Sequence, residues 1–428
     1  MSKRSLLIVL LAIFVVSLSL PLISSAQDGV ELRWRTRPDN QAEIDVYSAA
    51  SATIDEAWDG VTLVYEPGGS EGAGYQDVLI SEIEAGTAPD VFWIPGTDVA
   101  RFAKSGLILN LADLAAEDAD FNAADFYAGP MGFLQTSIAE GEDALWGLPR
   151  DVSAFAIYYN ADLFDEAGLP YPGGDDWNWE RFAEAANAIN DLGDDIVGFG
   201  MNAWWANWGY FINSAGSSFF NEDYTGCGLN NEATVVGLEA AKGLFDSGAA
   251  LPWGTDSEPP FLAGQLGMFM NGRWATPGTI ANADFNWNVA PLPVGPSGKA
   301  TNWLFWGAYV VNANTAHPAE AWDLVTRLTS AEIQGQIASL GANIPSRATE
   351  AAIELFLGTL PDSGVNNQAF VDGTTSEDVR TEAPLFNGDW PAIDQAYGTG
   401  VNAVFNGEIT AQEFADTICD QVAANFGS

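Results

Sequence analysis

The chain has 428 residues, of which 58 are acidic and 15 are basic, so its formal charge is −43. A charge of this sign and size repels nucleic acid and anionic membrane surfaces, and both are excluded as partners. The length exceeds what one hydrophobic core normally organises, so two domains are expected.

Residues 1–26 have the layout of a secretory signal peptide. Two basic residues precede a long apolar run, and the small residues Ser24-Ser25-Ala26 offer a cleavage site. An uncleaved N-terminal anchor is the alternative, because the apolar run is slightly long. No cysteine follows the run, so no lipid-anchoring cysteine is expected. The exported part, residues 27–428, keeps 13 basic and 58 acidic residues, a formal charge of −45, and is expected in the periplasm or outside the cell.

From Val30 onward, strand and helix patterns alternate along the chain. This alternation indicates an α/β architecture with mostly parallel sheets flanked by helices. Ligands of such sheets bind beyond the carboxyl ends of the strands, so the loops that begin at Arg37, Pro67 and Trp93 are expected on one face. The predicted strands lie at 32–36, 61–65, 90–94, 155–159, 197–201, 261–269 and 308–311, and the helices at 75–84, 179–189, 231–245, in two segments up to 340, and beyond 390.

The two cysteines, Cys227 and Cys419, predict one disulfide, because the chain is exported. Two buried free thiols are the alternative. There is no CxxC motif and no Cys/His cluster, so no metal site is expected. The chain also lacks the GxSxG, P-loop, GxGxxG and HExxH motifs, and no cofactor is expected.

Tryptophan is the most informative residue type, with sixteen copies. An indole ring offers a large rigid apolar face with one N–H donor, which suits the C–H face and hydroxyl rim of a pyranose. Any one of these residues could instead fill a core or cover a loop. Together they favour a sugar-binding cleft. The candidates, all expected in loops that follow strands, are Trp93, Trp204, Trp205, Trp208, Trp274, Trp303, Trp306 and Trp390.

Polar side chains lie near these tryptophans in the sequence. A carboxylate that accepts bonds from two neighbouring hydroxyls gains about 1.5–3 kcal/mol for each charge-assisted bond. Each polar residue could instead be a solvated surface group or a helix cap. The candidates are Arg37, Asp98, Asp151, Ser153 and Asn271.

Several segments resemble the family 1 extracellular solute-binding proteins of carbohydrate ABC importers, the group that includes maltose-binding protein. The similarity spans nearly the whole exported chain. The segments that carry it are "AGTAPDVFWIPGTDVARFAKSGLILNL" (85–111), "LPRDVSAFAIYYNADLFDEAGLP" (148–170), "WNWERFAEAA" (177–186), "GQLGMFMNGRWA" (264–275), "AYVVNANTAHPAEAWDLVTRL" (308–328) and "GANIPSR" (341–347).

The resemblance implies the two-lobe fold of periplasmic binding proteins, with a sugar held between lobes that close on a hinge. It implies that Trp93 and Trp274 occupy the family's aromatic positions. It also implies that the protein delivers its carbohydrate to membrane permease subunits, acts as a monomer and is not an enzyme. The expected divisions are residues 27–152 plus 301–350 for the N-terminal lobe and 153–300 plus 351–428 for the C-terminal lobe.

Two alternatives remain open at this point. A secreted glycoside hydrolase also needs a tryptophan-lined cleft, with two carboxylates across the scissile bond. The same fold could bind a polyamine or glycerol phosphate instead of a sugar. The number of tryptophans favours a sugar of more than one ring.

The charge of −45 is typical of a protein that works in high salt, where ions screen the repulsion between carboxylates. We therefore expect the melting temperature to rise between low and molar salt in a thermal unfolding experiment. An unchanged melting temperature would contradict this expectation.

Overall fold

The computed structural model describes residues 29–38, 41–69, 74–339, 341, 343–360 and 363–427. The predicted signal peptide, residues 1–26, lies outside these ranges. Every helix within them is too short or too polar to span a lipid bilayer.

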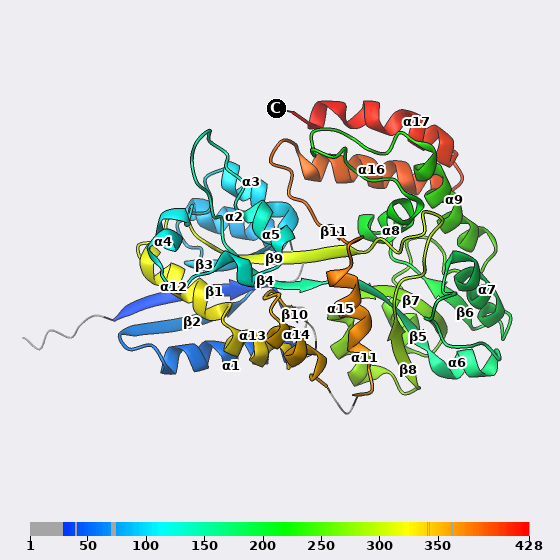
Figure 1. Ribbon diagram of the computed structural model, residues 1–428, viewed down its shortest axis with the longest axis horizontal. Coiled ribbons are helices and arrows are strands. Elements are labelled where there is room, and N and C mark those ends of the chain that lie inside the picture. Colours follow the sequence, from blue (N-terminus) through cyan, green and yellow to red (C-terminus); the bar gives the residue numbers. More distant parts are fainter. Residues whose placement is uncertain are drawn as a thin grey trace, which may run out of the picture.

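The strands and helices alternate for most of the chain (Figure 1). The strands are β1 Val30–Thr36, β2 Val61–Pro67, β3 Val91–Pro95, β4 Leu148–Ser153, β5 Phe155–Asn160, β6 Val197–Gly200, β7 Leu266–Gly272, β8 Trp287–Ala290, β9 Trp303–Val311, β10 Ile344–Pro345 and β11 Arg380–Thr381. The helices are α1 Gln41–Glu56, α2 Tyr75–Ala85, α3 Val99–Lys104, α4 Ala112–Glu117, α5 Ala128–Leu134, α6 Ala161–Glu166, α7 Trp179–Asn190, α8 Trp205–Ala215, α9 Glu232–Asp246, α10 Glu258–Leu262, α11 Thr276–Asn282, α12 Pro318–Leu328, α13 Ala331–Ala338, α14 Glu350–Leu357, α15 Asn367–Thr375, α16 Trp390–Phe405 and α17 Ala411–Val422.

Two sheets form the centres of two lobes, as predicted. The larger sheet has the order β10-β4-β9-β3-β1-β2, with β11 paired to β9, and the smaller has the order β6-β7-β5-β8. Both sheets are mixed, which corrects the expectation of mostly parallel sheets. In the larger sheet β9 runs antiparallel to β3 and β4, and in the smaller sheet β5 runs antiparallel to β7 and β8. The strands β4, β5 and β9, at which the chain passes from one lobe to the other, all take part in antiparallel pairs.

Strands β4 and β5 form the first crossing between the lobes. Only Ala154 separates them, yet β4 belongs to the larger sheet and β5 to the smaller. At this point the Asn302 side chain accepts the Phe155 N–H at 3.0 Å and donates to the Phe155 carbonyl at 2.8 Å. The Ser153 hydroxyl accepts the Arg273 N–H at 3.0 Å. These bonds fix the backbone where the two sheets meet.

The segment after residue 350 contacts both lobes. Helix α14 packs against α13 and β10, whereas α15 contacts β4 and β9 of the larger sheet and β5 and β8 of the smaller one. The lobe boundaries near residues 152, 300 and 350 stay a prediction. The contacts of α14 and α15 indicate that the third crossing between the lobes, near residue 350, extends over both helices.

The predicted strands and helices are mostly confirmed, but the structure contains further helices. The helices α1, α4, α5, α8, α10, α11, α14 and α15 occupy stretches for which the sequence analysis predicted no helix. Phe261, expected at the start of a strand, lies in helix α10, and the strand β7 begins at Leu266. The helix predicted over 179–189 is α7, and its N-cap Asn178 accepts the Arg181 N–H at 3.1 Å.

A disulfide joins Cys227 to Cys419, the pairing predicted from the sequence. It links the loop before α9 to α17, which pack against each other in the smaller lobe. The two cysteines are 192 positions apart, and the chain between them passes through the larger lobe before it returns.

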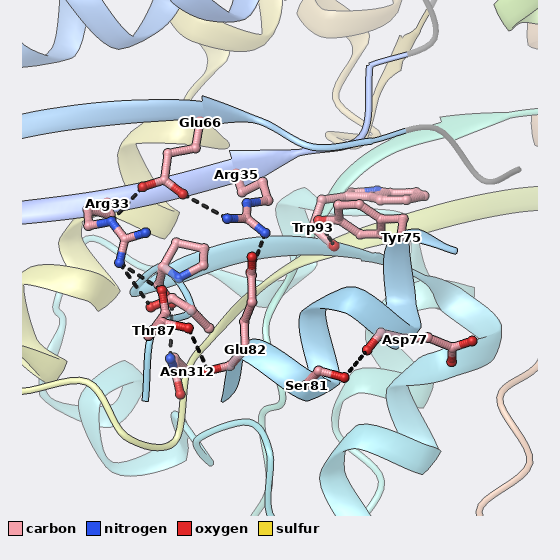
Figure 2. A network of polar contacts seen from close by, with 12 residues as sticks. Arg33, Arg35, Glu66, Tyr75, Asp77, Ser81, Glu82, Thr87, Trp93 and Asn312 are labelled. Carbon is pink, nitrogen blue, oxygen red and sulfur yellow. Dashed lines mark hydrogen bonds and ion pairs between the residues drawn. The ribbon is translucent and has the colours of Figure 1, made fainter. Parts of the chain in front are cut away.

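An ion-pair network holds α2 against the edge of the larger sheet (Figure 2). Glu66 on β2 accepts from Arg33 at 2.5 Å and from Arg35 at 2.8 Å, and Arg35 also reaches Glu82 on α2 at 2.5 Å. Burial opposes the Arg35 charge, but the bonds to Glu66 and Glu82 outweigh it and raise the pKa of this guanidinium. The network fixes α2, whose first residue, Tyr75, donates its hydroxyl to the Trp93 carbonyl at 2.9 Å.

We expect Arg35→Met to lower the free energy of unfolding by about 2 kcal/mol, because it leaves Glu66 and Glu82 without their shared cation. The matched control is Lys242→Met, which removes a surface pair with Asp246, a residue whose side chain is 61% exposed. The Lys242→Met substitution is expected to lower the free energy of unfolding by about 0–1 kcal/mol. Urea unfolding measures both, and equal losses would show that the Arg35 network adds nothing beyond a surface pair.

Candidate functional site

A cavity of about 1050 Å³ opens between the two sheets. Its wall includes residues of the larger sheet, such as Trp93 and Trp306, and residues of the smaller lobe, such as Asn271 and Trp390. The structure brings eleven of the thirteen predicted ligand residues to this wall: Arg37, Trp93, Asp98, Asp151, Ser153, Trp204, Trp205, Asn271, Trp274, Trp306 and Trp390.

Trp208 and Trp303 are not at the cavity, which corrects two predictions. Trp208 lies within α8, is 1% exposed and packs on Phe219 with ring centroids 4.7 Å apart. Trp303 lies within β9, and its indole N–H donates to the Ala206 carbonyl at 2.9 Å. Both rings fill the core of the smaller lobe, because α8 and the start of β9 continue regular elements where the sequence predicted loops.

Trp204 and Trp274 present the most accessible aromatic surface of the cavity. Trp204 is 36% exposed and stacks on Phe305 with centroids 5.3 Å apart and planes 24° from parallel. Its ring lies 6.2 Å from that of Trp274. Trp204 occupies the N-cap position of α8, and Trp274 follows β7 in a short 3-10 helix. Backbone geometry at these two element ends therefore aims both rings at the space between the lobes.

Trp93 lies deeper and is covered by cations. It is 6% exposed, and the guanidinium carbons of Arg37 and Arg150 lie 4.8 and 4.7 Å from its ring centroid. Arg150 also pairs with Asp151 at 2.7 Å. Burial opposes the Arg150 charge, but Asp151 raises its pKa well above the ordinary value. Trp93 thus binds protein cations through its ring and reaches the cavity with only a small area.

Two glycines allow the indole rings to approach the backbone. A Cβ atom on Gly307 would lie 2.0 Å from Nε1 of Trp93, and one on Gly96 would lie 2.5 Å from Cε2 of Trp306. Pro95 and Gly307 are paired in the β3–β9 register, so the two contacts lie side by side. The absence of side chains at these glycines lets the Trp93 and Trp306 rings pack directly against the backbone beside the cavity.

Carboxylates are the second feature of the wall. Burial raises the pKa of Glu382 from 4.5 to about 8, and the neighbouring Asp98 adds to this rise. Burial also raises the pKa of Asp394 to about 6 and that of Asp98, although Arg101 opposes the Asp98 shift with an ion pair at 2.7 Å. Within the described part of the chain, Glu382 and Asp394 form no ion pair.

Several wall residues were missed by the sequence analysis. Asp394 lies one helical turn after Trp390 on α16, so the i, i+4 spacing places both on one face and could have indicated it. Glu382 follows β11, a two-residue strand with no sequence pattern of its own. The others, including Gln76, Asn202, Asn207, Glu258 and Phe305, come from separate elements that only the fold brings together.

The described residues contain no group of three or more His, Cys, Asp or Glu side chains that could hold a metal ion. The chemistry of the wall is therefore that of aromatic faces, amides, carboxylates and guanidinium groups.

Comparison with known proteins agrees with this geometry. The family model of the bacterial extracellular solute-binding proteins matches residues 42–335. The chain belongs to this family. The resemblance seen in the sequence is thereby confirmed, and a binding protein of Brucella abortus is 24% identical to this solute-binding protein over 91% of this chain and 92% of its own.

Solved structures have the same fold. An ABC substrate-binding protein from Listeria monocytogenes, in complex with cycloalternan, has a TM-score of 0.80 at 20% identity and covers 93% of this chain and 99% of its own. The GacH receptor of Streptomyces glaucescens, solved unliganded and with acarbose, has a TM-score of 0.77 at 20% identity, with 92% and 97% covered. The two-lobe fold of this solute-binding protein is therefore established.

Glu382 predicts a distinct pH dependence of stability. Between about pH 4.5 and 8 the unfolded chain loses this proton while the folded chain keeps it. The folded state therefore loses up to about 1.4 kcal/mol of stability for each pH unit of rise across this window. Glu382→Gln removes that contribution, so its stability relative to the native protein is expected to increase steadily from pH 5 to pH 8.

Urea unfolding at pH 5, 6.5 and 8 measures this difference. The control is Glu354→Gln, an exposed position on α14 away from the cavity. A difference between Glu382→Gln and the native protein that stays constant over the three pH values would contradict the assignment.

Proposed function

We propose that this solute-binding protein is an extracytoplasmic carbohydrate receptor. It binds a sugar between its two lobes, closes on its hinge, and presents the closed form to the permease subunits of an ABC importer. It acts as a monomer, carries out no catalysis, and reaches its location through a signal peptide at residues 1–26.

The aromatic wall is the observation that carries this proposal. Trp204 and Trp274 offer two ring faces at one cavity, and Phe305 supports the first of them. The polar groups of Asp151, Ser153 and Asn271 line the same space. Stacking faces with hydrogen-bonding groups at their rim match the two kinds of surface that a pyranose presents.

The size of the cavity favours a sugar of more than one ring. Sites for small molecules typically enclose about 300–1,000 Å³, and this cavity of about 1050 Å³ is slightly larger than that range. Two structurally similar receptors were solved with cycloalternan and with acarbose, which supports the same class of ligand.

The test is a thermal-shift screen of the exported chain, residues 27–428. The panel contains mono- and oligosaccharides, with spermidine and glycerol phosphate as non-sugar controls. A sugar that binds only the folded state at a hundredfold excess over its Kd stabilises it by about 2.7 kcal/mol. A shift with a control compound and none with any sugar would overturn the carbohydrate proposal, and turnover of a chromogenic glycoside would favour the hydrolase.

We expect Trp204→Ala and Trp274→Ala each to weaken binding of the sugar found in this screen at least tenfold, or about 1.4 kcal/mol. The reason is the loss of a stacking face. Trp58→Ala is the matched control, because Trp58 does not line the cavity. Isothermal titration calorimetry gives the three dissociation constants, and a tenfold loss in the control as well would show that the effect is not local.

A further inference from the structure

Two tryptophans of the cavity wall, one from each lobe, are joined by a row of three further aromatic rings. Trp306 of the larger lobe stacks on Phe133 of α5, with ring centroids 6.5 Å apart and planes 3° from parallel. Trp390 of the smaller lobe contacts Phe220 at 5.8 Å. Tyr224 lies between them, with its ring 5.8 Å from that of Phe133 and 5.8 Å from that of Phe220. The row therefore passes from one lobe to the other at the contact between Tyr224 and Phe133.

Tyr224 belongs to a short hairpin, residues 220–227, whose base is held by the smaller lobe. Phe220 and Cys227 form an antiparallel bridge, and the disulfide from Cys227 to Cys419 ties this base to α17. Phe220 and Cys227 also pack against the core of the smaller lobe. The hairpin is therefore anchored in one lobe, while the Tyr224 ring at its tip contacts the other.

The tip of the hairpin keeps Tyr224 in a backbone conformation that is uncommon for a residue with a side chain. Its φ is +58°, in the left-handed region. The Asn221 side-chain oxygen accepts the N–H groups of Thr225 and Gly226 at 2.8 and 2.9 Å. The Asn221 N–H donates to the Gly226 carbonyl at 2.9 Å. These bonds fix the backbone that carries the Tyr224 ring.

Core packing within the smaller lobe does not account for the Tyr224 ring. Phe219, next to the hairpin, is 1% exposed and fills that core, whereas Tyr224 is 39% exposed. The planes of the Tyr224 and Phe133 rings are 85° apart, which is the favourable edge-to-face geometry of an aromatic pair. Because the two rings belong to separate lobes, their attraction stabilises one relative position of the lobes.

We propose that Tyr224 is a latch that holds the lobes together, so that the walls of both lobes face one sugar. The inference rests on the proposed carbohydrate-binding function and adds a positioning residue to it. A sugar that contacts both walls binds only when the lobes are together, and its apparent affinity falls with the fraction of molecules in that state. Tyr224 raises this fraction, and therefore the affinity, without contacting the sugar.

The first measurement needs no ligand. Small-angle X-ray scattering of the exported chain, residues 27–428, gives the radius of gyration of the sugar-free protein. Tyr224→Ala is expected to increase this radius, because the lobes separate without the latch. Tyr224→Phe keeps the ring and is expected to match the native value. Tyr171→Ala is the matched control, because Tyr171 is 49% exposed and its ring pairs at 5.5 Å with Tyr159 of its own lobe.

The second measurement is the affinity for acarbose, with which the similar GacH receptor was solved. Calorimetry is expected to give a Kd about two- to tenfold higher for Tyr224→Ala, the range that one edge-to-face aromatic pair supplies. Tyr224→Phe and Tyr171→Ala are expected to leave the Kd unchanged.

The other ring of the pair provides a second variant. Phe133→Ala is expected to raise both the radius of gyration and the Kd. Combined with Tyr224→Ala, it is expected to raise the Kd by less than the product of the two single effects, because both substitutions break the same contact. Phe133 lies on α5, in the other lobe, so this variant keeps the test valid if Tyr224→Ala fails to fold.

The outcomes separate the latch from the function beneath it. A native radius of gyration in Tyr224→Ala, or an equal increase in Tyr171→Ala, would overturn the latch and leave the carbohydrate receptor standing. Single effects of Tyr224→Ala and Phe133→Ala that multiply in full would show that the rings act separately, which also refutes the latch. Binding of no sugar in the thermal-shift panel would overturn the carbohydrate function, and the scattering result would still decide whether Tyr224 holds the lobes together.

Discussion

The complete burial of strand β9 is the constraint on which both lobes depend. All nine of its residues are buried, and it pairs with β3 on one side and β4 on the other. Successive side chains of a strand point to opposite faces. Here Leu304 and Trp306 pack in the core of the larger lobe, whereas Trp303 and Phe305 pack in that of the smaller one. One strand thus joins two cores and brings Phe305 and Trp306 to the cavity between them.

Basic residues are scarce in this chain, so the position of a buried arginine indicates a structural role. With a formal charge of −43, cations are scarce, yet Arg150 is placed at the bottom of the cavity between Asp151 and the ring of Trp93. Removal of a carboxylate partner would leave this guanidinium buried and uncompensated. Arg150 and Asp151 therefore form a fixed ion pair beside Trp93 in the cavity wall.

The sequence predicted the regular part of the fold because local patterns encode it. The strands β1, β2 and β3 and the helix α2 were recognisable from apolar spacing and glycine or proline stops. Tryptophan was harder to place, because the same ring suits a core and a cleft. Trp204 at a helix cap lines the cavity, while Trp208, one turn later, is buried. Glu382 could not be found at all, since its role arises from burial beside Asp98, 284 positions away in the chain.

The acids also bear on how closure would work. Asp98 belongs to the larger lobe and Asp394 to the smaller one, so carboxyl groups of both lobes line the same cavity. A ligand drives closure only by binding the closed form better than the open form. Shifting an equilibrium from 1:99 to 99:1 needs about 5.5 kcal/mol of such preference. Two charge-assisted bonds of about 1.5–3 kcal/mol each, made only when the lobes close, would supply most of it. A ligand that bonds to the carboxyl groups of both lobes would thus favour the closed form.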